Sequence, residues 1–143
     1  MGLIRGIMTT SAAHLASPPA WKLWTGRVFS AIPALMMIMS AGMKLAHPPD
    51  FLTNWVGKFG YPEGAATPIG IVELLCVVLY LVPRTRVFGA ILMTGYLGGA
   101  VATHVRIGDP SAFAPVLLGI MAWGGLFLRD ERLPELIPLV KGK

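Results

Sequence analysis

Residues 64–83 read GAATPIGIVELLCVVLYLVP, a run of 20 residues that contains a single charged side chain, Glu73. A helix of about 20 apolar residues crosses the roughly 30 Å hydrocarbon core of a bilayer, because each residue adds about 1.5 Å. This stretch is apolar around its whole circumference, whereas a helix on the surface of a soluble domain is apolar along one face. The run therefore predicts a transmembrane helix.

Three further runs have the same apolar character. They cover residues 28–43, 87–103 and 110–128. The first is short for a membrane span, and we expect the apolar stems of Arg27 and Lys44 to extend it towards the headgroups. Most of the connections between the runs are short, which places consecutive helices side by side and antiparallel.

The expected fold is an all-α membrane protein, an up-down bundle of four transmembrane helices within residues 23–129. In this interpretation residues 1–22 form a cytoplasmic or interfacial arm and residues 130–143 a cytoplasmic tail. The longest connection, residues 46–63, is rich in aromatic side chains, which favour the membrane–water interface. We expect it to lie at that interface and to cover the mouth of the bundle.

The composition excludes several classes of protein. Hydrophobic residues make up 55% of the chain and charged residues 13%. A soluble domain has a larger share of charged residues, and a disordered chain has fewer hydrophobic residues. One cysteine, Cys76, excludes a disulfide framework and a thiolate-held metal cluster. The net charge of +5 comes from Lys and Arg that flank the apolar runs, so we expect no nucleic-acid partner.

The distribution of Lys and Arg predicts the orientation in the membrane. Nine of them lie in the N-terminal arm, in the linker at residues 84–86 and in the tail. The other three, Lys44, Lys58 and Arg106, lie on the opposite side. Since Lys and Arg concentrate on the cytoplasmic side, both termini are expected in the cytoplasm.

Short motifs predict how the helices begin and pack. Thr67 stands before Pro68 as an N-cap residue stands before a proline at the first helical position, and Asp109 is placed to cap the fourth helix. Gly95 and Gly99 have the G-x-x-x-G spacing that lets two membrane helices approach closely. We therefore expect these two glycines at a contact between helices.

Three stretches and the start of the tail carry a family resemblance. The stretches read PAL followed by SAGMKL within residues 33–45, PIGIVELLC at 68–76 and LVPRTRVFGAILMTGYLGGAVATHVR at 81–106, and the tail begins with WGGLFLRD at 123–130. On these motifs the chain resembles the DoxX-like family over roughly residues 24–140. The resemblance implies a small four-helix protein of the bacterial inner membrane. Through the family's association with thiosulfate and quinone oxidation, it also implies a quinone-like ligand or an accessory redox role.

Glu73, His104 and Lys44 are the candidate catalytic residues. Glu73 lies near the middle of its run, where a charge costs a few kcal/mol, so the carboxyl must be protonated, paired or next to a wet cavity. Lys44 and His104 lie near the outer ends of their helices, so three helices each bring one ionisable group to the outer half of the bundle. In the alternative interpretation Glu73 fixes packing, Lys44 reaches the headgroups and His104 ends a helix.

Seven further side chains are candidates for ligand binding because helical spacing places them on the same faces as the three ionisable groups or next to them. They are Ser40, Cys76, Tyr80, Tyr96, Thr103, Arg106 and Asp109. We expect no metal site, because a set of ligands that includes His47 would form only if its loop folded down. Cys76 has no second cysteine to resolve a disulfide, and the sequence identifies no cofactor.

Three functional classes remain open. The first is an inner-membrane protein that binds a lipid-soluble, quinone-like ligand in the outer half of the bundle, or an accessory redox subunit. The second is a membrane-embedded acid/base enzyme (an isomerase, cyclase or hydrolase) of an apolar substrate, in which Glu73 donates a proton and His104 accepts one. The third is a structural subunit or chaperone. The expected partners are the lipid bilayer, a lipid-soluble small molecule and either a second copy or another membrane protein.

Overall fold

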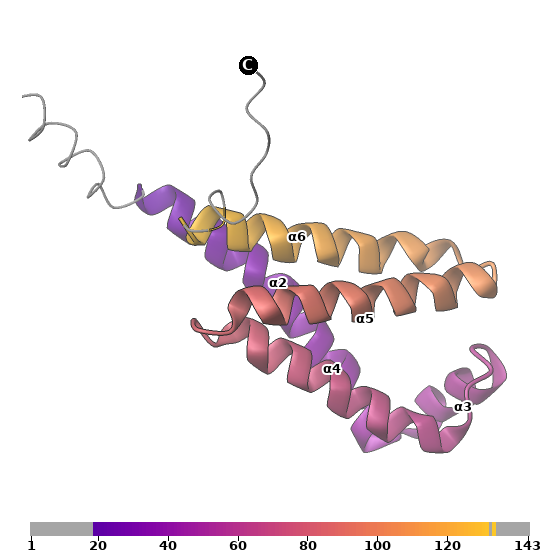
Figure 1. The fold of residues 1–143 in the computed structure, drawn as a ribbon. Helices are drawn as coiled ribbons and strands as arrows, with labels where there is room; N and C mark the ends of the chain where they lie inside the picture. Colours follow the sequence, from indigo (N-terminus) through magenta and orange to yellow (C-terminus); the bar gives the residue numbers. More distant parts are fainter. Residues whose placement is uncertain (1–18, 132, 134–143) are drawn as a thin grey trace, which may run out of the picture.

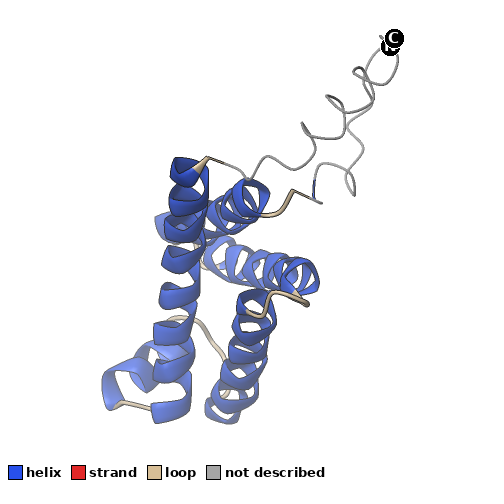
Figure 2. Cartoon of the chain, turned by 90° about the vertical axis from the view of Figure 1, so that its left-hand side faces the viewer, coloured by secondary structure: helices blue, strands red, loops and turns tan. Residues whose placement is uncertain are grey.

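The computed structural model describes residues 19–131 and residue 133, and this part of the chain is almost entirely helical (Figures 1 and 2). Four of its helices are long and apolar enough to cross a membrane. They are α2 (Ala20–Ala46), α4 (Ala66–Leu81) with the preceding 3-10 turn η1 (Glu63–Ala65), α5 (Arg86–Arg106), and α6 (Phe113–Arg129) with the preceding turn η2 (Pro110–Ala112). The expected all-α fold with four membrane-spanning helices is confirmed.

The four long helices form a ring. Helix α2 packs against α4 and α6, and α5 packs against the same two helices, so α2 and α5 face each other across the bundle. Figure 1 shows the start of α2, the end of α6 and the turn between α4 and α5 at one end of the bundle. The short helix α3 (Pro49–Gly57) and the turn between α5 and α6 lie at the other end. This is the up-down connectivity that the short linkers predicted.

The helix boundaries differ from the sequence expectation at two places. Helix α2 begins at Ala20, so residues 20–22 belong to its first turn rather than to an arm. Thr67 does not cap α4, because the turn η1 leads directly into that helix and Ala65 occupies the cap position. Asp109 does cap its turn as expected, because its side chain accepts a hydrogen bond from the backbone N–H of Ser111 at 2.8 Å.

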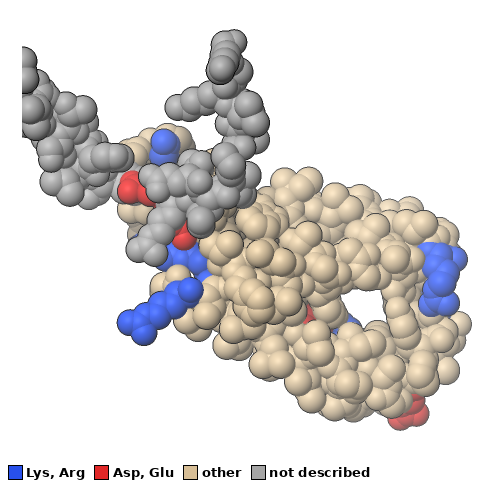
Figure 3. Space-filling model, in the orientation of Figure 1, with Lys and Arg blue, Asp and Glu red and all other residues tan. Residues whose placement is uncertain are grey.

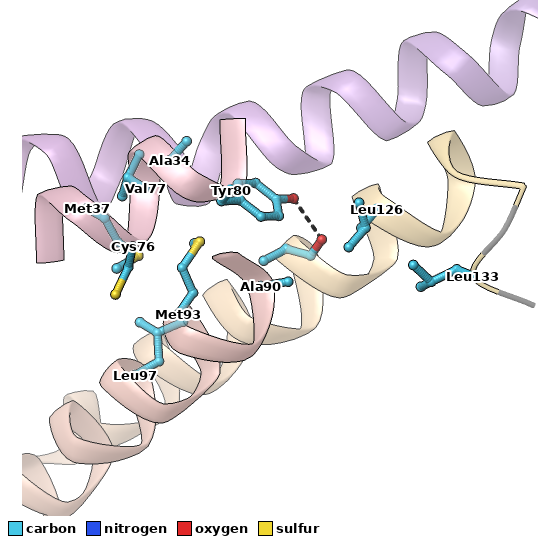
Figure 4. Packing of buried hydrophobic residues seen from close by; sticks show 11 residues of the cluster. Ala34, Met37, Cys76, Val77, Tyr80, Ala90, Met93, Leu97, Leu126 and Leu133 are labelled. Carbon is cyan, nitrogen blue, oxygen red and sulfur yellow. Dashed lines mark hydrogen bonds between the residues drawn. The ribbon is translucent and has the colours of Figure 1, made fainter. Parts of the chain in front are cut away.

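The closed core lies in the half of the bundle away from α3 and is centred on Tyr80. This side chain is 1% exposed. Its hydroxyl is hydrogen-bonded to the Ala122 carbonyl at 2.8 Å (Figure 4) and also to Ser30 Oγ at 2.7 Å. Cys76 is buried in the same cluster as a small apolar residue. Leu133, which belongs to the predicted cytoplasmic tail, is fully buried here. Residue 132 and residues 134–143 of that tail lie outside the described residues.

Close approach between helices occurs at glycines other than the predicted pair. A Cβ at Gly89 would lie 2.2 Å from the backbone nitrogen of Tyr80, and one at Gly125 would overlap the backbone of α2. A Cβ at Gly95 or Gly99 would meet no atom of the described residues within 4 Å. The expectation that these two glycines form a contact between helices of the bundle is therefore wrong, because α4 and α6 approach α5 on other faces.

Candidate functional site

A cavity of about 530 Å³ lies between the helices in the half of the bundle that carries α3. Figure 3 shows an opening through the molecule with acidic and basic atoms at its margin. The long helices run across this view, so the opening lies on the side of the bundle, where lipid surrounds a membrane protein, rather than at its end. The volume falls within the range of about 300–1,000 Å³ that is common for small-molecule sites.

A triad of hydrogen-bonded side chains forms the polar wall of this cavity. Glu73 Oε2 accepts hydrogen bonds from Lys44 Nζ at 3.0 Å and from Ser40 Oγ at 3.3 Å. Lys44 Nζ also lies 2.6 Å from Ser40 Oγ, and these two residues are four apart on one face of α2. The triad therefore joins α2 to α4 through a closed set of three contacts.

The ion pair in this triad is buried. The side chain of Glu73 is 2% exposed and that of Lys44 is 10% exposed. Two charges out of water are tolerated where they compensate each other and satisfy their hydrogen bonds, as they do here. Of the possibilities left open by the sequence, Glu73 is both paired and part of a cavity wall, and Lys44 turns inward rather than towards the headgroups.

Two neighbouring residues hold Lys44 in this position. A Cβ at Gly70 would lie 2.9 Å from Lys44 Cβ, so the missing side chain lets α4 approach the base of the lysine. The ring centroid of Trp55 lies 6.0 Å from Lys44 Nζ, at the range of a cation–π contact. The ammonium group therefore has partners on α2, α4 and α3.

We call the side chains of Phe51, Trp55, Phe59 and Tyr61 the aromatic cover, because all four line the cavity from α3 and the loop after it. Trp55 stacks between Phe51 and Tyr61, with ring centroids 5.4 and 4.7 Å away, and donates its indole N–H to the Pro62 carbonyl at 3.0 Å. At 6% exposure Trp55 is a buried wall of the cavity, whereas the sequence indicated an interfacial tryptophan.

Contacts with α5 fasten the aromatic cover. Thr103 donates its hydroxyl hydrogen to the Gly99 carbonyl at 3.0 Å, so the Tyr61 hydroxyl, 2.7 Å away, donates to Thr103. Arg106 donates to the Phe59 carbonyl, and its guanidinium lies 5.7 Å from the Tyr61 ring centroid. Arg106 is thus a fastening residue and is absent from the described cavity lining.

Asp109 provides the second fastening point. Its carboxylate lies 2.6 Å from Lys58 Nζ, and this hydrogen bond together with the N–H of Ser111 holds the pKa of Asp109 well below its usual value. Asp109 Oδ2 also faces His104 Nδ1 at 3.6 Å, beyond hydrogen-bond distance. Within the described part of the chain this buried Nδ1 has no hydrogen-bond partner. The His104 ring lines the cavity and meets Phe59 edge-on at 5.6 Å.

The structure brings six of the ten candidate residues to the cavity. They are Ser40, Lys44, Glu73, Tyr96, Thr103 and His104. The other four lie elsewhere, Cys76 and Tyr80 in the core and Arg106 and Asp109 in the fastening contacts. Cys76 and Tyr80 do share the face of Glu73, but this face descends into the half of the bundle where the helices are closely packed.

Sequence reasoning missed the part that Lys58, Trp55 and two glycines play. Lys58 served only in the count of positive charges, and Gly95 and Gly99 were assigned to helix contact although they line the cavity. The density of aromatic residues between the first two spans was the available signal for Trp55. Among residues 19–131 and 133, no group of three or more His, Cys, Asp or Glu side chains is placed to hold a metal ion.

Comparison with known proteins gives one match. The model of the DoxX-like family matches residues 28–125, which is more than half of the chain and includes every residue that lines the cavity. No curated protein and no solved structure matches the chain significantly.

The buried pair predicts non-additive mutations. Lys44→Met removes the partner charge of Glu73, so the buried carboxyl must take up a proton, and the free energy of unfolding should fall by up to about 3–5 kcal/mol. The double variant Lys44→Met/Glu73→Leu removes both charges and should recover much of that loss. Unfolding of the detergent-solubilised single and double variants measures the coupling. Losses that simply add would contradict an interaction between the two side chains.

The fastening at Asp109 predicts an acid-sensitive cover. Because folding lowers this pKa, the unfolded chain binds more protons, so the stabilisation is present above the ordinary Asp pKa of about 3.9 and is lost as the pH falls below it. The protection factors of the amides of residues 58–61, which correct exchange for its intrinsic pH dependence, should fall at acid pH in the wild type. Asp109→Asn should show low protection factors already at neutral pH and no further acid step. An identical acid step in this variant would refute the assignment.

Proposed function

The chain belongs to the DoxX-like family, here a small membrane protein with four membrane-spanning helices, and we propose that it binds a neutral, lipid-soluble ligand in its cavity. One observation carries the proposal. The buried ion pair of Lys44 and Glu73 lines a largely apolar cavity that opens on the side of the bundle. The polar head of the ligand would lie beside this pair and its apolar part among the surrounding helices.

The charges of the wall favour a neutral head. Lys44 and Glu73 compensate each other, so an ionised ligand would add an unpaired charge to a largely apolar cavity. A carbonyl oxygen can accept a hydrogen bond from the ammonium, and a hydroxyl can donate one to the carboxylate. Tyr96 and His104 line the same cavity and add further polar atoms from α5.

The remaining walls favour a lipid-soluble body. Met36, Met37, Ile69 and Leu118 line the cavity with apolar surface. The side opening gives access from the hydrocarbon, where such a molecule is dissolved. A quinone combines the required properties, since it has a neutral ring, carbonyl acceptors and an apolar tail. An accessory redox role follows if the protein presents this quinone to an oxidoreductase partner.

We place the cavity in the outer half of a bacterial inner membrane, with both termini in the cytoplasm. The described Lys and Arg residues support this orientation. Five of them lie at the end of the bundle away from α3, and two lie at the α3 end, besides the buried Lys44. The five are Lys22, Arg27, Arg84, Arg86 and Arg129, and the two are Lys58 and Arg106. An excess of positive charge marks the cytoplasmic side.

An acid/base enzyme is the second candidate, because Glu73, Tyr96 and His104 line one cavity. The contact with Lys44 changes the assignment of roles that the sequence suggested. Because Ser40 and Lys44 donate hydrogen bonds to Glu73, the carboxylate carries no proton to give away, so Glu73 would act as the base rather than the acid. Conversion of a bound apolar substrate distinguishes this candidate from simple binding.

Native mass spectrometry of gently solubilised protein tests the proposal. We expect an apolar molecule to copurify with the wild type and to be absent from Glu73→Gln. Binding of an added one-prenyl benzoquinone should weaken about tenfold or more in this variant, because a charged hydrogen-bond partner contributes about 1.5–3 kcal/mol. A product of different mass would favour the enzyme.

Tyr80→Phe is the matched control for loss of stability. It removes buried hydrogen bonds outside the cavity and should retain the ligand. The proposal fails if the wild type neither carries an apolar molecule nor binds the benzoquinone. It also fails if Glu73→Gln binds as well as the wild type does.

A further inference from the structure

Two positions of helix α5 that line the cavity have no side chain. Gly95 and Gly99 lie one helical turn apart, and both line the cavity. A Cβ at either position would meet no atom of the described residues within 4 Å, whereas at Gly89 on the same helix it would overlap α4. Packing requires glycine at Gly89 but does not require it at the other two positions.

The polar wall faces these two positions. Helices α2 and α5 are opposite members of the ring, and Ser40 and Lys44 line the same cavity from α2. The cavity thus has the hydrogen-bonding groups of Ser40 and Lys44 on one wall. The opposite wall combines side chains of α5, such as Tyr96 and His104, with two positions that have no side chain. The two glycines alone would not define a site. The site is defined independently of the glycines by the cavity and by the buried Glu73 in its wall, which is 2% exposed.

We propose that Gly95 and Gly99 are specificity-determining residues that select a ligand with a flat ring over an acyclic one. The ring would lie against the backbone of α5 while its oxygen substituents reach Lys44 and Glu73. Glycine permits this close approach because it has no Cβ, and a flat ring gains dispersion contacts over its whole face there. The inference rests on the proposed function and names the ligand class of the same site.

The proposal separates the stability of α5 from its selectivity. Glycine within a helix is less favourable than alanine, and neither position has a neighbour that an alanine methyl group would displace. Gly95→Ala/Gly99→Ala should therefore melt at the wild-type temperature or above it. The same variant should bind ring ligands more weakly, because the two methyl groups occupy the slot.

Gly98 supplies a matched control on the same helix. A Cβ at this position also meets no described atom within 4 Å, but Gly98 lines the outer groove between α5 and α6 instead of the cavity. Gly98→Leu therefore adds the same side chain as Gly95→Leu or Gly99→Leu at a place that the ligand does not occupy.

Dissociation constants of two probes test the inference. One probe is a one-prenyl benzoquinone, which has a flat ring, and the other is farnesol, an acyclic prenyl alcohol. The wild type and Gly98→Leu should bind the benzoquinone about tenfold or more tightly than farnesol, which corresponds to about 1.4 kcal/mol. Gly95→Leu and Gly99→Leu should lose this preference through weaker binding of the benzoquinone.

The outcomes separate the inference from the proposed function. A preference retained in Gly95→Leu and Gly99→Leu, or lost equally in Gly98→Leu, overturns the inference. A wild type that binds both probes equally, and loses both in Glu73→Gln, supports the cavity as a binding site but overturns ring selection. If the leucine variants do not fold, the alanine double variant decides, because unchanged benzoquinone affinity in that stable protein overturns the inference.

Discussion

The buried ion pair between Lys44 and Glu73 joins α2 to α4 and forms the polar wall of the cavity. A charge in the apolar part of a membrane protein needs a partner, and here the partner comes from the neighbouring helix. Ser40 completes the hydrogen bonds, and Gly70 lets α4 approach the base of the lysine. The pair therefore fixes α2 against α4 and leaves a polar wall that apolar side chains of neighbouring helices do not cover.

The two halves of the bundle differ in how closely their helices pack. In the half that contains Tyr80, the helices meet closely at Gly89 and Gly125, and the buried hydroxyl is hydrogen-bonded to α2 and α6. In the other half the helices enclose a cavity, and a short aromatic segment between α2 and α4 forms part of its wall. Polar contacts of Arg106 and Asp109 hold that segment in place. The fold thus combines a closely packed half with a cavity whose aromatic cover is held by a few polar contacts.

The four spans followed from the sequence, because apolar length can be counted along a chain. The sequence left open whether Lys44 turns inward or reaches the headgroups. Helical periodicity correctly placed Tyr80 on the face of Glu73. It does not indicate at which point along that face the cavity ends and close packing between the helices begins. The same limit explains Gly95 and Gly99, because their spacing is equally suited to a helix contact and to a bare cavity wall. Arg106 was predicted to contact the ligand. Its actual partner, the Phe59 carbonyl in the loop after α3, is distant in sequence, so helical spacing could not reveal this contact.

Infrared spectroscopy of the protein in bilayers tests the central claim most directly, because it distinguishes an ionised carboxylate from a protonated carboxyl. The difference spectrum between the wild type and Glu73→Gln isolates this one group. The account predicts a carboxylate band at neutral pH, replaced by a protonated carboxyl band in Lys44→Met, where the partner charge is gone. A protonated carboxyl band for Glu73 in the wild type would contradict the ion pair and the polar wall built on it.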